Sequence, residues 1–343
     1  MMNFNKHQST IYCVLLGIII GALFIFGAPM DGSFSWADSP RHALNGAFIM
    51  DLFKDLPFDD PVGYAYNYYS QFPALTILFY PPLYSFILAP FYAIFGVSQE
   101  SALLTGYVCY TFSAVGVYFL ARNWLSQFAS FSTALIFVLA PEITFWGRQV
   151  MLEVPVYAFL NWGIYFFVEY IKTEKIYQLY LSIALLVLGL YIKTPIAFIA
   201  IPLLFVLLRK RGLDVFKDKH TYIIAFLAIV GIIPLVYITL EFGQVNLQAV
   251  TDIADAEVDK YSLSGLLWYL LQTPSQLGIG HISLSYIQTY ILPYDEYIFS
   301  QHFKLHNLSR KRINSVNSSF QHIALNHRAN SRWRTGINQI ARF

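Results

Sequence analysis

Six ionisable side chains lie next to apolar runs in this sequence, and they are the residues that could do chemistry. Three of them fall within five positions, shortly after the first apolar run, and the others precede or separate later apolar runs. Ionisable groups at membrane depth are costly and usually face protein or a water-filled cavity, so a functional role is the first hypothesis. The six are Asp38, Arg41, His42, Arg148, Glu153 and Lys193.

Carboxylates and cations together suit a transfer reaction on a phosphate-linked substrate. A carboxylate can take the proton of a hydroxyl, and arginine or lysine can hold a phosphate. Structural alternatives stay open for each residue. Asp38 could be a solvated loop acid, and Glu153, two residues before Pro155, could simply stabilise the first turn of a helix. Arg148 could form an ion pair with Glu153 or contact a lipid headgroup.

The segment RHALNGAFIMDLFKDL, which starts at Arg41, is amphipathic. Its apolar residues recur at roughly helical spacing, which predicts a helix along the membrane interface. Arg41 would then lie near Asp38, whereas His42 could be an interfacial residue with no part in catalysis. Four tyrosines between residues 64 and 69 are more typical of an aromatic belt than of a substrate platform.

The composition places these residues in a polytopic membrane protein. Of the 343 residues, 57% are hydrophobic and 12% are charged, with a mean hydropathy of +0.51. Soluble domains carry about a quarter charged residues. Cys13 and Cys109 both fall inside apolar runs, so no disulfide framework is implied. The predicted fold class is all-α: a polytopic transmembrane helical bundle with juxtamembrane helices in the first outer loop.

A helix needs about 17–25 apolar residues to cross a bilayer. The first run exceeds the apolar core of about 7–15 residues of a signal peptide, which favours an uncleaved anchor over a cleaved leader. Lys193-Thr194-Pro195 predicts a hairpin between two of the runs, because proline interrupts helical pairing. The candidate runs are 11–28, 76–97, 103–121, 128–146, 154–171, 177–192, 195–208 and 221–240.

Basic loops predict the orientation, since Lys and Arg favour the cytoplasmic side. The loops at Arg122, 172–175 and 209–219 share that side with Lys6 only if the run 76–97 does not cross. We therefore expect 76–97 to be juxtamembrane or re-entrant, starting at its double proline. Loop 29–75 then lies outside, and Asp38, Arg148, Glu153 and Lys193 converge on the outer membrane face.

The sequence lacks the motifs of several classes of soluble enzyme. It has no dinucleotide fingerprint, Walker lysine, zinc-ligand spacing or nucleophile elbow. Without a soluble nucleotide-sugar domain, an activated donor would have to arrive through the lipid. A transporter or flippase would also place Asp, Glu and Lys at a membrane cavity, although internal repeats are not visible. A non-catalytic membrane subunit is a third alternative.

The order of short motifs resembles the multi-span membrane glycosyltransferases of the GT-C type that use polyprenyl-phosphate sugars. The pattern is an outer-loop acid, then YPPLY, then a span ending in R-x-W, then WGRQVMLEVPVYAF. It is similar to that of the dolichyl-phosphate-mannose protein mannosyltransferases and the lipid A aminoarabinose transferases, over residues 10 to about 240.

The resemblance implies roles for individual residues. Asp38 takes the place of the family's outer-loop acid, with Ser39 where a second acid is common. Arg41 corresponds to an arginine that contacts the lipid phosphate in some relatives, and Glu153 to a second acid with Arg148 beside it. Tyr80 stands where many relatives have a phosphate-contacting lysine, and Lys193, in a KTP turn, would supply that positive charge instead.

The expected activity is that of an inverting glycosyltransferase, a hexosyl- or pentosyltransferase, acting on the outer face of a bacterial plasma membrane. Its donor would be a polyprenyl-phosphate sugar, and its acceptor a lipid, glycan or protein, with no nucleic acid. Asp38 and Glu153 would be catalytic, and Arg41, His42, Tyr80, Arg148 and Lys193 would bind substrate. No cofactor is certain; a divalent ion could bridge Asp38 and Glu153, but two carboxylates do not establish one.

The character of the sequence changes near residue 301. Residues 1–300 are expected to form a membrane glycosyltransferase domain that is incomplete compared with the family. Residues 304–343 carry eight Lys or Arg and no Asp or Glu, and hydrophobic periodicity disappears. We expect residues 301–343 to be a frameshift or truncation product; a genuine basic, disordered tail is the alternative. An inactive, truncated relative is therefore a further reading of the chain.

Overall fold

The computed structural model describes residues 2–29, 32, 34–77, 79–252, 262–263 and 267. Contacts divide the chain into two units, Met1–Leu240 and Glu241–Phe343, and the first contains all six ionisable residues. The expected polar tail, residues 301–343, lies outside the described residues. Every regular element in the described part is helical, which confirms the all-α prediction.

Among the described residues, four helices are long and apolar enough to cross a membrane. They are α1 (Met2–Gly27), α5 (Gln99–Ala121), α8 (Glu153–Thr173) and α11 (Lys219–Asp252), with apolar spans at His7–Gly27, Gln99–Ala121, Glu153–Thr173 and Lys219–Glu241. A fifth span would be formed by α6 (Gln127–Leu139) and α7 (Pro141–Gly147), which meet at a bend of 67°. Pro141 causes this break, since proline cannot continue the hydrogen-bond ladder of α6.

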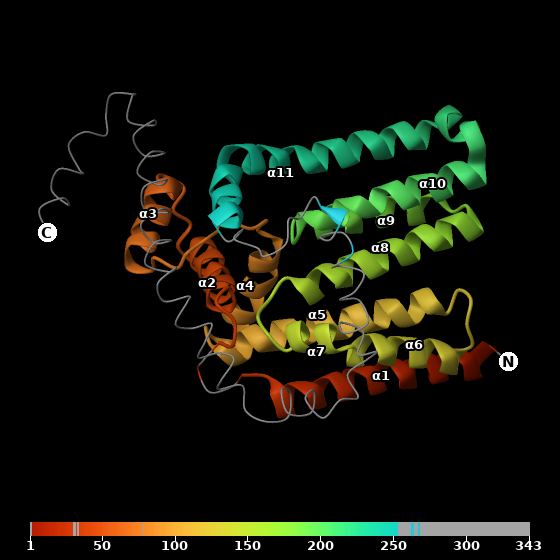
Figure 1. Cartoon of the computed structure of the whole chain (residues 1–343), viewed down its shortest axis with the longest axis horizontal. Helices are drawn as coiled ribbons and strands as arrows, with labels where there is room; N and C mark the ends of the chain where they lie inside the picture. The colour runs from red at the N-terminus through yellow and green to blue at the C-terminus, as the bar shows by residue number, and fades with distance from the viewer. Residues whose placement is uncertain are drawn as a thin grey trace, which may run out of the picture. The chain divides into compact units, whose positions relative to one another are not determined.

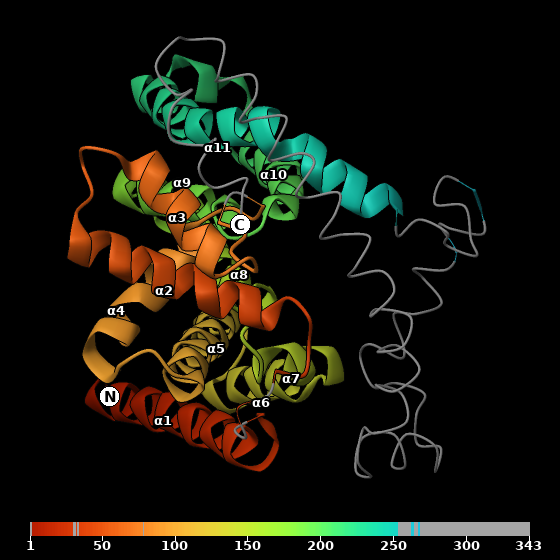
Figure 2. The same cartoon turned by 90° about the vertical axis from the view of Figure 1, so that its left-hand side faces the viewer.

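The remaining elements are shorter. Two apolar helices, α4 (Leu83–Phe95) and α9 (Ile176–Leu190), accompany the spans, and α9 leads through η1 (Thr194–Ile199) into α10 (Ala200–Arg211). A short 3-10 helix, η2 (Gly212–Lys217), connects α10 to α11. Figures 1 and 2 show α2 (Ser39–Asp55), α3 (Pro61–Gln71) and α4 gathered at one end of the long helices.

Helix α4 has the length expected of a segment that does not cross. Its 13 residues begin directly after Pro81-Pro82. At about 1.5 Å per residue it is about 20 Å long, whereas the hydrocarbon core of a bilayer is about 30 Å thick. The α4 segment is thus too short for a full span, in keeping with the sequence-based topology.

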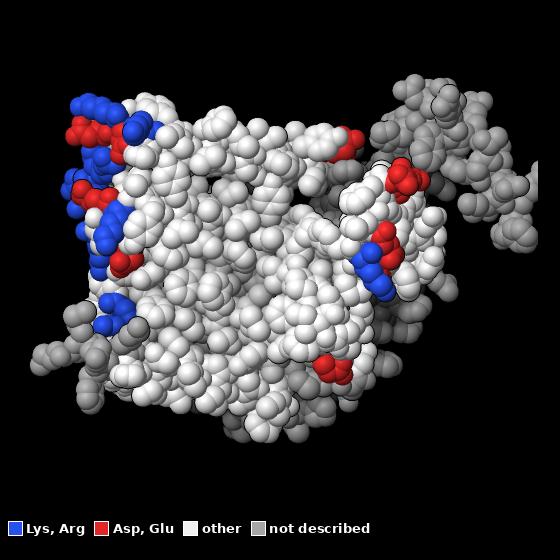
Figure 3. All heavy atoms as spheres, turned by 180° about the vertical axis from the view of Figure 1, so that it is seen from behind, with Lys and Arg blue, Asp and Glu red and all other residues white. Residues whose placement is uncertain are grey.

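The basic loops meet at the end of the bundle opposite α2–α4. Lys172 Nζ donates to the backbone carbonyl and side-chain oxygen of Asn123, each at 2.7 Å. Arg211 Nη1 donates to Tyr170 Oη at 2.8 Å. The predicted convergence of these loops is confirmed. Figure 3 shows Lys and Arg gathered at one end of the molecule.

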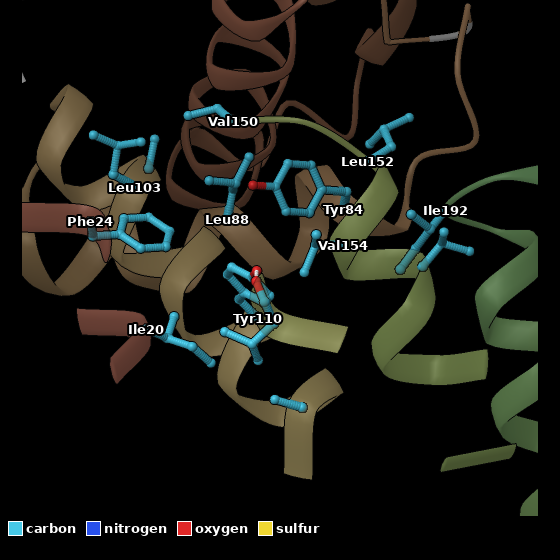
Figure 4. Close-up of a cluster of buried hydrophobic side chains, with 14 of the residues drawn as sticks. Ile20, Phe24, Tyr84, Leu88, Leu103, Tyr110, Val150, Leu152, Val154 and Ile192 are labelled. Atoms are coloured by element: carbon cyan, nitrogen blue, oxygen red, sulfur yellow. Dashed lines mark hydrogen bonds between the residues drawn. The ribbon is translucent and has the colours of Figure 1, made fainter. Parts of the chain in front are cut away.

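The core joins the start of α8 to the middle of the bundle. Val150, Leu152 and Val154 are buried around Glu153, and they belong to one cluster with Ile20 of α1 and Leu88 of α4. Figure 4 shows these side chains packed around Tyr84 and Tyr110. Because the flanking side chains are anchored in the core, the position of Glu153 is fixed by packing.

Helices α2 and α4 approach closely at Gly46. A Cβ atom added to Gly46 would lie 2.6 Å from the Cβ of Leu88, which is fully buried. We expect Gly46→Ala to force the two helices apart and to lower the free energy of unfolding by about 1–3 kcal/mol through overpacking. The measurement is the thermal midpoint of the purified protein in detergent.

Gly21→Ala in α1 is the matched control. Its Cβ would meet its nearest neighbour, Tyr107 Cε2, at 3.7 Å, an ordinary contact. That variant should keep or raise the midpoint, because alanine favours a helix over glycine. Equal midpoints for Gly46→Ala and Gly21→Ala would show that the approach of α2 to α4 is not tight.

Candidate active site

Asp38 sits at the junction between the first span and α2. It is the N-cap residue of α2, yet its side chain makes no capping hydrogen bond. Arg41 Nη1 binds Asp38 Oδ1 at 3.0 Å, and Tyr80 Oη donates to Asp38 Oδ2 at 3.0 Å. Both carboxylate oxygens therefore have a donor, one from α2 itself and one from the segment that precedes α4.

The segment that carries Tyr80 is fixed to α2 by Asn45. Thr76 N donates to Asn45 Oδ1 at 2.9 Å, and Asn45 Nδ2 donates to Thr76 Oγ1 at 3.3 Å. Asn45 is buried, so these bonds satisfy groups that water cannot reach. This buried amide positions Tyr80 beside Asp38. Sequence reasoning missed it, because an asparagine in an amphipathic segment carries no distinctive signal.

His42 lies behind the Asp38–Tyr80 hydrogen bond. Its side chain is only 3% exposed, and its ring centroid is 4.8 Å from that of Tyr80 and 6.3 Å from that of Tyr84. Burial lowers the pKa of His42 to about 4. The imidazole is therefore neutral at physiological pH.

Charges from two other parts of the chain reach the same imidazole. The carboxylates of Asp38 and Glu153 raise the pKa of His42, and Arg41 and Lys193 lower it, although burial outweighs all four. These interactions place Glu153 and Lys193 in the electrostatic neighbourhood of the Asp38 network. That these residues lie on the outer membrane face stays a prediction.

Glu153 and Lys193 form the second part of the site. Lys193 Nζ binds Glu153 Oε1 at 2.6 Å, with 39% and 21% of the two side chains exposed. Glu153 is the first residue of α8, and Lys193 directly precedes the 3-10 helix η1. Glu153 Oε2 is buried and accepts no hydrogen bond from the described residues.

One backbone hydrogen bond holds the two parts of the site together. Leu83 N, at the start of α4, donates to Tyr191 O, at the end of α9, at 2.9 Å. Tyr80 and Lys193 lie a few residues from this bond on their respective segments. The hairpin predicted at Lys193 is present as a turn, in which Lys193 N donates to Gly189 O at 3.0 Å.

Arg148 lies at the same end but in a separate contact. Its Nε donates to Thr144 O at 3.1 Å, and its guanidinium covers Gly27 at the end of α1. The sequence left open an ion pair between Arg148 and Glu153. Among the described residues, the ion-pair partner of Glu153 is Lys193 instead. Arg148 thus borders the Asp38 loop from the side of α1.

Two tyrosines of α3 bind acids of α2. Tyr64 Oη donates to Asp55 Oδ2 at 2.8 Å, and Tyr68 Oη donates to Asp51 Oδ2 at 3.0 Å. Burial, followed by the hydrogen bond that Tyr64 donates to Asp55, raises the pKa of Tyr64 to about 12. These two tyrosines attach α3 to α2, a role that the aromatic-belt interpretation did not include.

Residues 80–238 match the family model of the dolichyl-phosphate-mannose-protein mannosyltransferases. The resemblance drawn from the sequence is thereby confirmed, and the matched family is one of membrane glycosyltransferases of the GT-C type. The matched segment contains Tyr80, Arg148, Glu153 and Lys193 and begins after Asp38 and Arg41. No curated protein and no solved structure matches the chain.

The carboxylates of this mannosyltransferase-like site are paired with cations. Within the described ranges, no group of three or more His, Cys, Asp and Glu side chains is placed to hold a metal ion. Asp38 binds Arg41 and Glu153 binds Lys193. These pairings do not offer the set of open oxygen ligands that a divalent ion prefers, so the residues do not fit a resident metal.

The buried His42 predicts a pH-dependent stability. Between the folded pKa of about 4 and an unfolded value of about 6.5, the unfolded chain binds more protons. Stability should therefore fall as the pH drops through this range, by roughly 2 kcal/mol at pH 5 from this group alone. Thermal midpoints of the purified protein from pH 8 to pH 5 measure the effect.

His42→Asn should flatten that pH dependence, whereas His7→Asn, which replaces an exposed histidine, should leave it unchanged. The prediction fails if wild type and His42→Asn lose the same amount of stability on acidification. His42→Gln is the second variant to use if His42→Asn does not fold.

Proposed function

We propose that this glycosyltransferase moves a sugar, with inversion, from a polyprenyl-phosphate donor to an acceptor on the outer face of the membrane. The family supports the transfer of a sugar by a membrane protein. The lipid-phosphate donor rests on where the cations lie. Because the predicted orientation places the basic loops inside, the opposite end, with Asp38 and Glu153, faces outward.

The distribution of charge at the site end carries the proposal. This end is acidic overall, with Asp38, Asp51, Asp55, Asp59, Asp60, Glu100, Glu142 and Glu153. Its described cations are Arg41, Lys54, Arg148 and Lys193. All but Lys54 lie in or beside the site, so positive charge is concentrated where a phosphate would bind in otherwise acidic surroundings.

The transfer step can be written with these residues. A carboxylate, Asp38 or its partner Glu153, takes the proton of the acceptor hydroxyl. The acceptor oxygen bonds to the anomeric carbon on the face opposite the donor phosphate, and the bond between that carbon and the phosphate oxygen breaks. The electron pair leaves with the polyprenyl phosphate, whose added negative charge Arg41, Arg148 and Lys193 stabilise. The configuration at the anomeric carbon is inverted.

Arg41 has two partners available in this scheme. Without donor it binds Asp38 Oδ1 at 3.0 Å. A donor phosphate would compete for the same guanidinium, because a phosphate offers several acceptor oxygens in a geometry that suits arginine. Donor binding would then relieve Asp38 of one of its two hydrogen-bond donors and leave that oxygen available to a hydroxyl. His42 packs against Tyr80 beside these groups and, being neutral, adds no charge to them.

The enzyme class is tested by sugar transfer in membranes. We expect wild-type protein to transfer sugar from at least one member of a panel of radiolabelled polyprenyl-phosphate sugars. Asp38→Asn should lose about 100-fold or more of the rate, as expected for removal of a general base. Asp59→Asn, which replaces an exposed acid of the same loop, should keep it. No transfer from any donor by properly inserted wild-type protein would point to a transporter or an inactive relative.

Tyr80 provides a test of how Asp38 is held. Tyr80→Phe removes the hydroxyl that donates to Asp38 Oδ2 and keeps the ring against His42. A hydrogen bond to a charged group contributes about 1.5–3 kcal/mol, so kcat should fall roughly tenfold or more while the donor KM stays near the wild-type value. A raised donor KM at unchanged kcat would show instead that Tyr80 contacts the donor phosphate.

A further inference from the structure

The end of the bundle opposite the site carries an excess of positive charge. Its acids are Glu169, Glu174, Asp214 and Asp218. Its cations are Arg122, Lys172, Lys175, Arg209, Lys210, Arg211, Lys217 and Lys219. The two kinds of side chain appear together at one end in Figure 3, with Lys and Arg in the majority. The transfer reaction proposed above uses none of them.

Part of this charge has a structural role. Lys172 binds Asn123 and lies over the ring of Trp124, with Nζ 5.3 Å from its centroid. Arg211 binds Asp218 at 2.9 Å, and Lys217 binds Asp214 at 2.7 Å. These contacts connect the loops of this end to one another. Both acids between α10 and α11, Asp214 and Asp218, are paired in them.

Arg122 Nη1 donates to the backbone carbonyl of Leu125. Four cations remain without such contacts, and we call them the basic collar. They are Lys175, Arg209, Lys210 and Lys219. All four are exposed, and their side chains make no hydrogen bond or ion pair with any described residue. They come from the start of α9, the end of α10 and the start of α11, so three chain segments contribute to a single charged rim.

Apolar side chains are exposed between the collar residues. In η2, Leu213 is 76% exposed and Phe216 is 51% exposed, whereas Val215 between them is buried. Trp124, at the end of α5, is 65% exposed. Exposed aromatic and aliphatic groups at the ends of membrane-spanning helices are typical of the headgroup region of a bilayer. Cations that lie beside such groups are at the depth of lipid phosphates.

We infer that the basic collar binds the headgroups of anionic phospholipids. The four cations form no ion pair with any residue in the described part of the chain, and the anionic headgroups of a leaflet would provide a counter-charge at the same depth. Each Lys or Arg near an anionic membrane surface contributes about 1 kcal/mol, which corresponds to roughly a fivefold preference. A soluble polyanion would not account for the exposed Leu213 and Phe216 beside the charges.

The preference for anionic headgroups can be measured from the lipid that stays bound to the purified protein. The purified protein is exchanged into micelles that contain equal amounts of phosphatidylglycerol and phosphatidylcholine, and the bound lipid is identified by native mass spectrometry. We expect wild type to retain several-fold more phosphatidylglycerol. The variant with Lys175→Gln, Arg209→Gln, Lys210→Gln and Lys219→Gln should lose that enrichment. About 1 M salt should weaken it in wild type, since the Debye length is then about 3 Å.

Lys54→Gln is the matched control, because Lys54 is an exposed cation at the opposite end of the bundle. It should retain phosphatidylglycerol like wild type. Transfer activity and thermal midpoint in zwitterionic detergent should be unchanged in the fourfold variant, which separates a failure of the collar from a failure of the proposed enzyme activity. If the fourfold variant does not insert, the pairs Lys175→Gln with Lys219→Gln and Arg209→Gln with Lys210→Gln should each reduce the enrichment.

Three results would overturn the inference. The first is an equal retention of both lipids by wild type, and the second is an enrichment that the fourfold variant keeps. The third is displacement of phosphatidylglycerol by millimolar inorganic phosphate at constant ionic strength, which would mark a site for a small soluble anion and not for a lipid headgroup.

Discussion

Pairing of charge at the edge of the bilayer is the constraint on which this structure depends. A charged group that leaves water must find a counter-charge or a hydrogen-bond donor, because its desolvation is otherwise too costly. Asp38 meets this requirement with Arg41 and Tyr80, and Glu153 meets it with Lys193. The helices that carry these residues end where the charged partners can meet. The need to pair charges therefore determines which side chains make up the site.

The sequence predicted the helical class, the membrane setting and the family, because these depend on composition, run length and motif order. It also predicted that the Asp38 loop and the Lys193 turn would share one end, since basic loops elsewhere determine the direction of each helix. The ion pair between Glu153 and Lys193 and the role of Tyr80 were not predicted as such. Both join positions about 40 residues apart, and periodicity contains no information on which side chains meet across helices.

The family comparison and the geometry support different parts of the proposed enzyme. The matched residues, 80–238, contain one of the two carboxylates and most of the bundle, whereas Asp38 and Arg41 precede the match. Their assignment rests on contacts, above all on the hydrogen bond that connects Asp38 to Tyr80, the first matched residue. The buried, neutral His42 is influenced by charges from both parts of the chain: Asp38 and Arg41 before the matched residues, and Glu153 and Lys193 within them.

The hydrogen bond between Leu83 N and Tyr191 O involves main-chain atoms alone. Its geometry does not depend on the type of side chain at the positions of Tyr80, Lys193 or their neighbours, provided that the backbone conformation is unchanged. Side chains in this region can therefore be exchanged during evolution while the two segments stay in register. The resemblance to the family implies one such exchange, with Tyr80 in the place of a lysine.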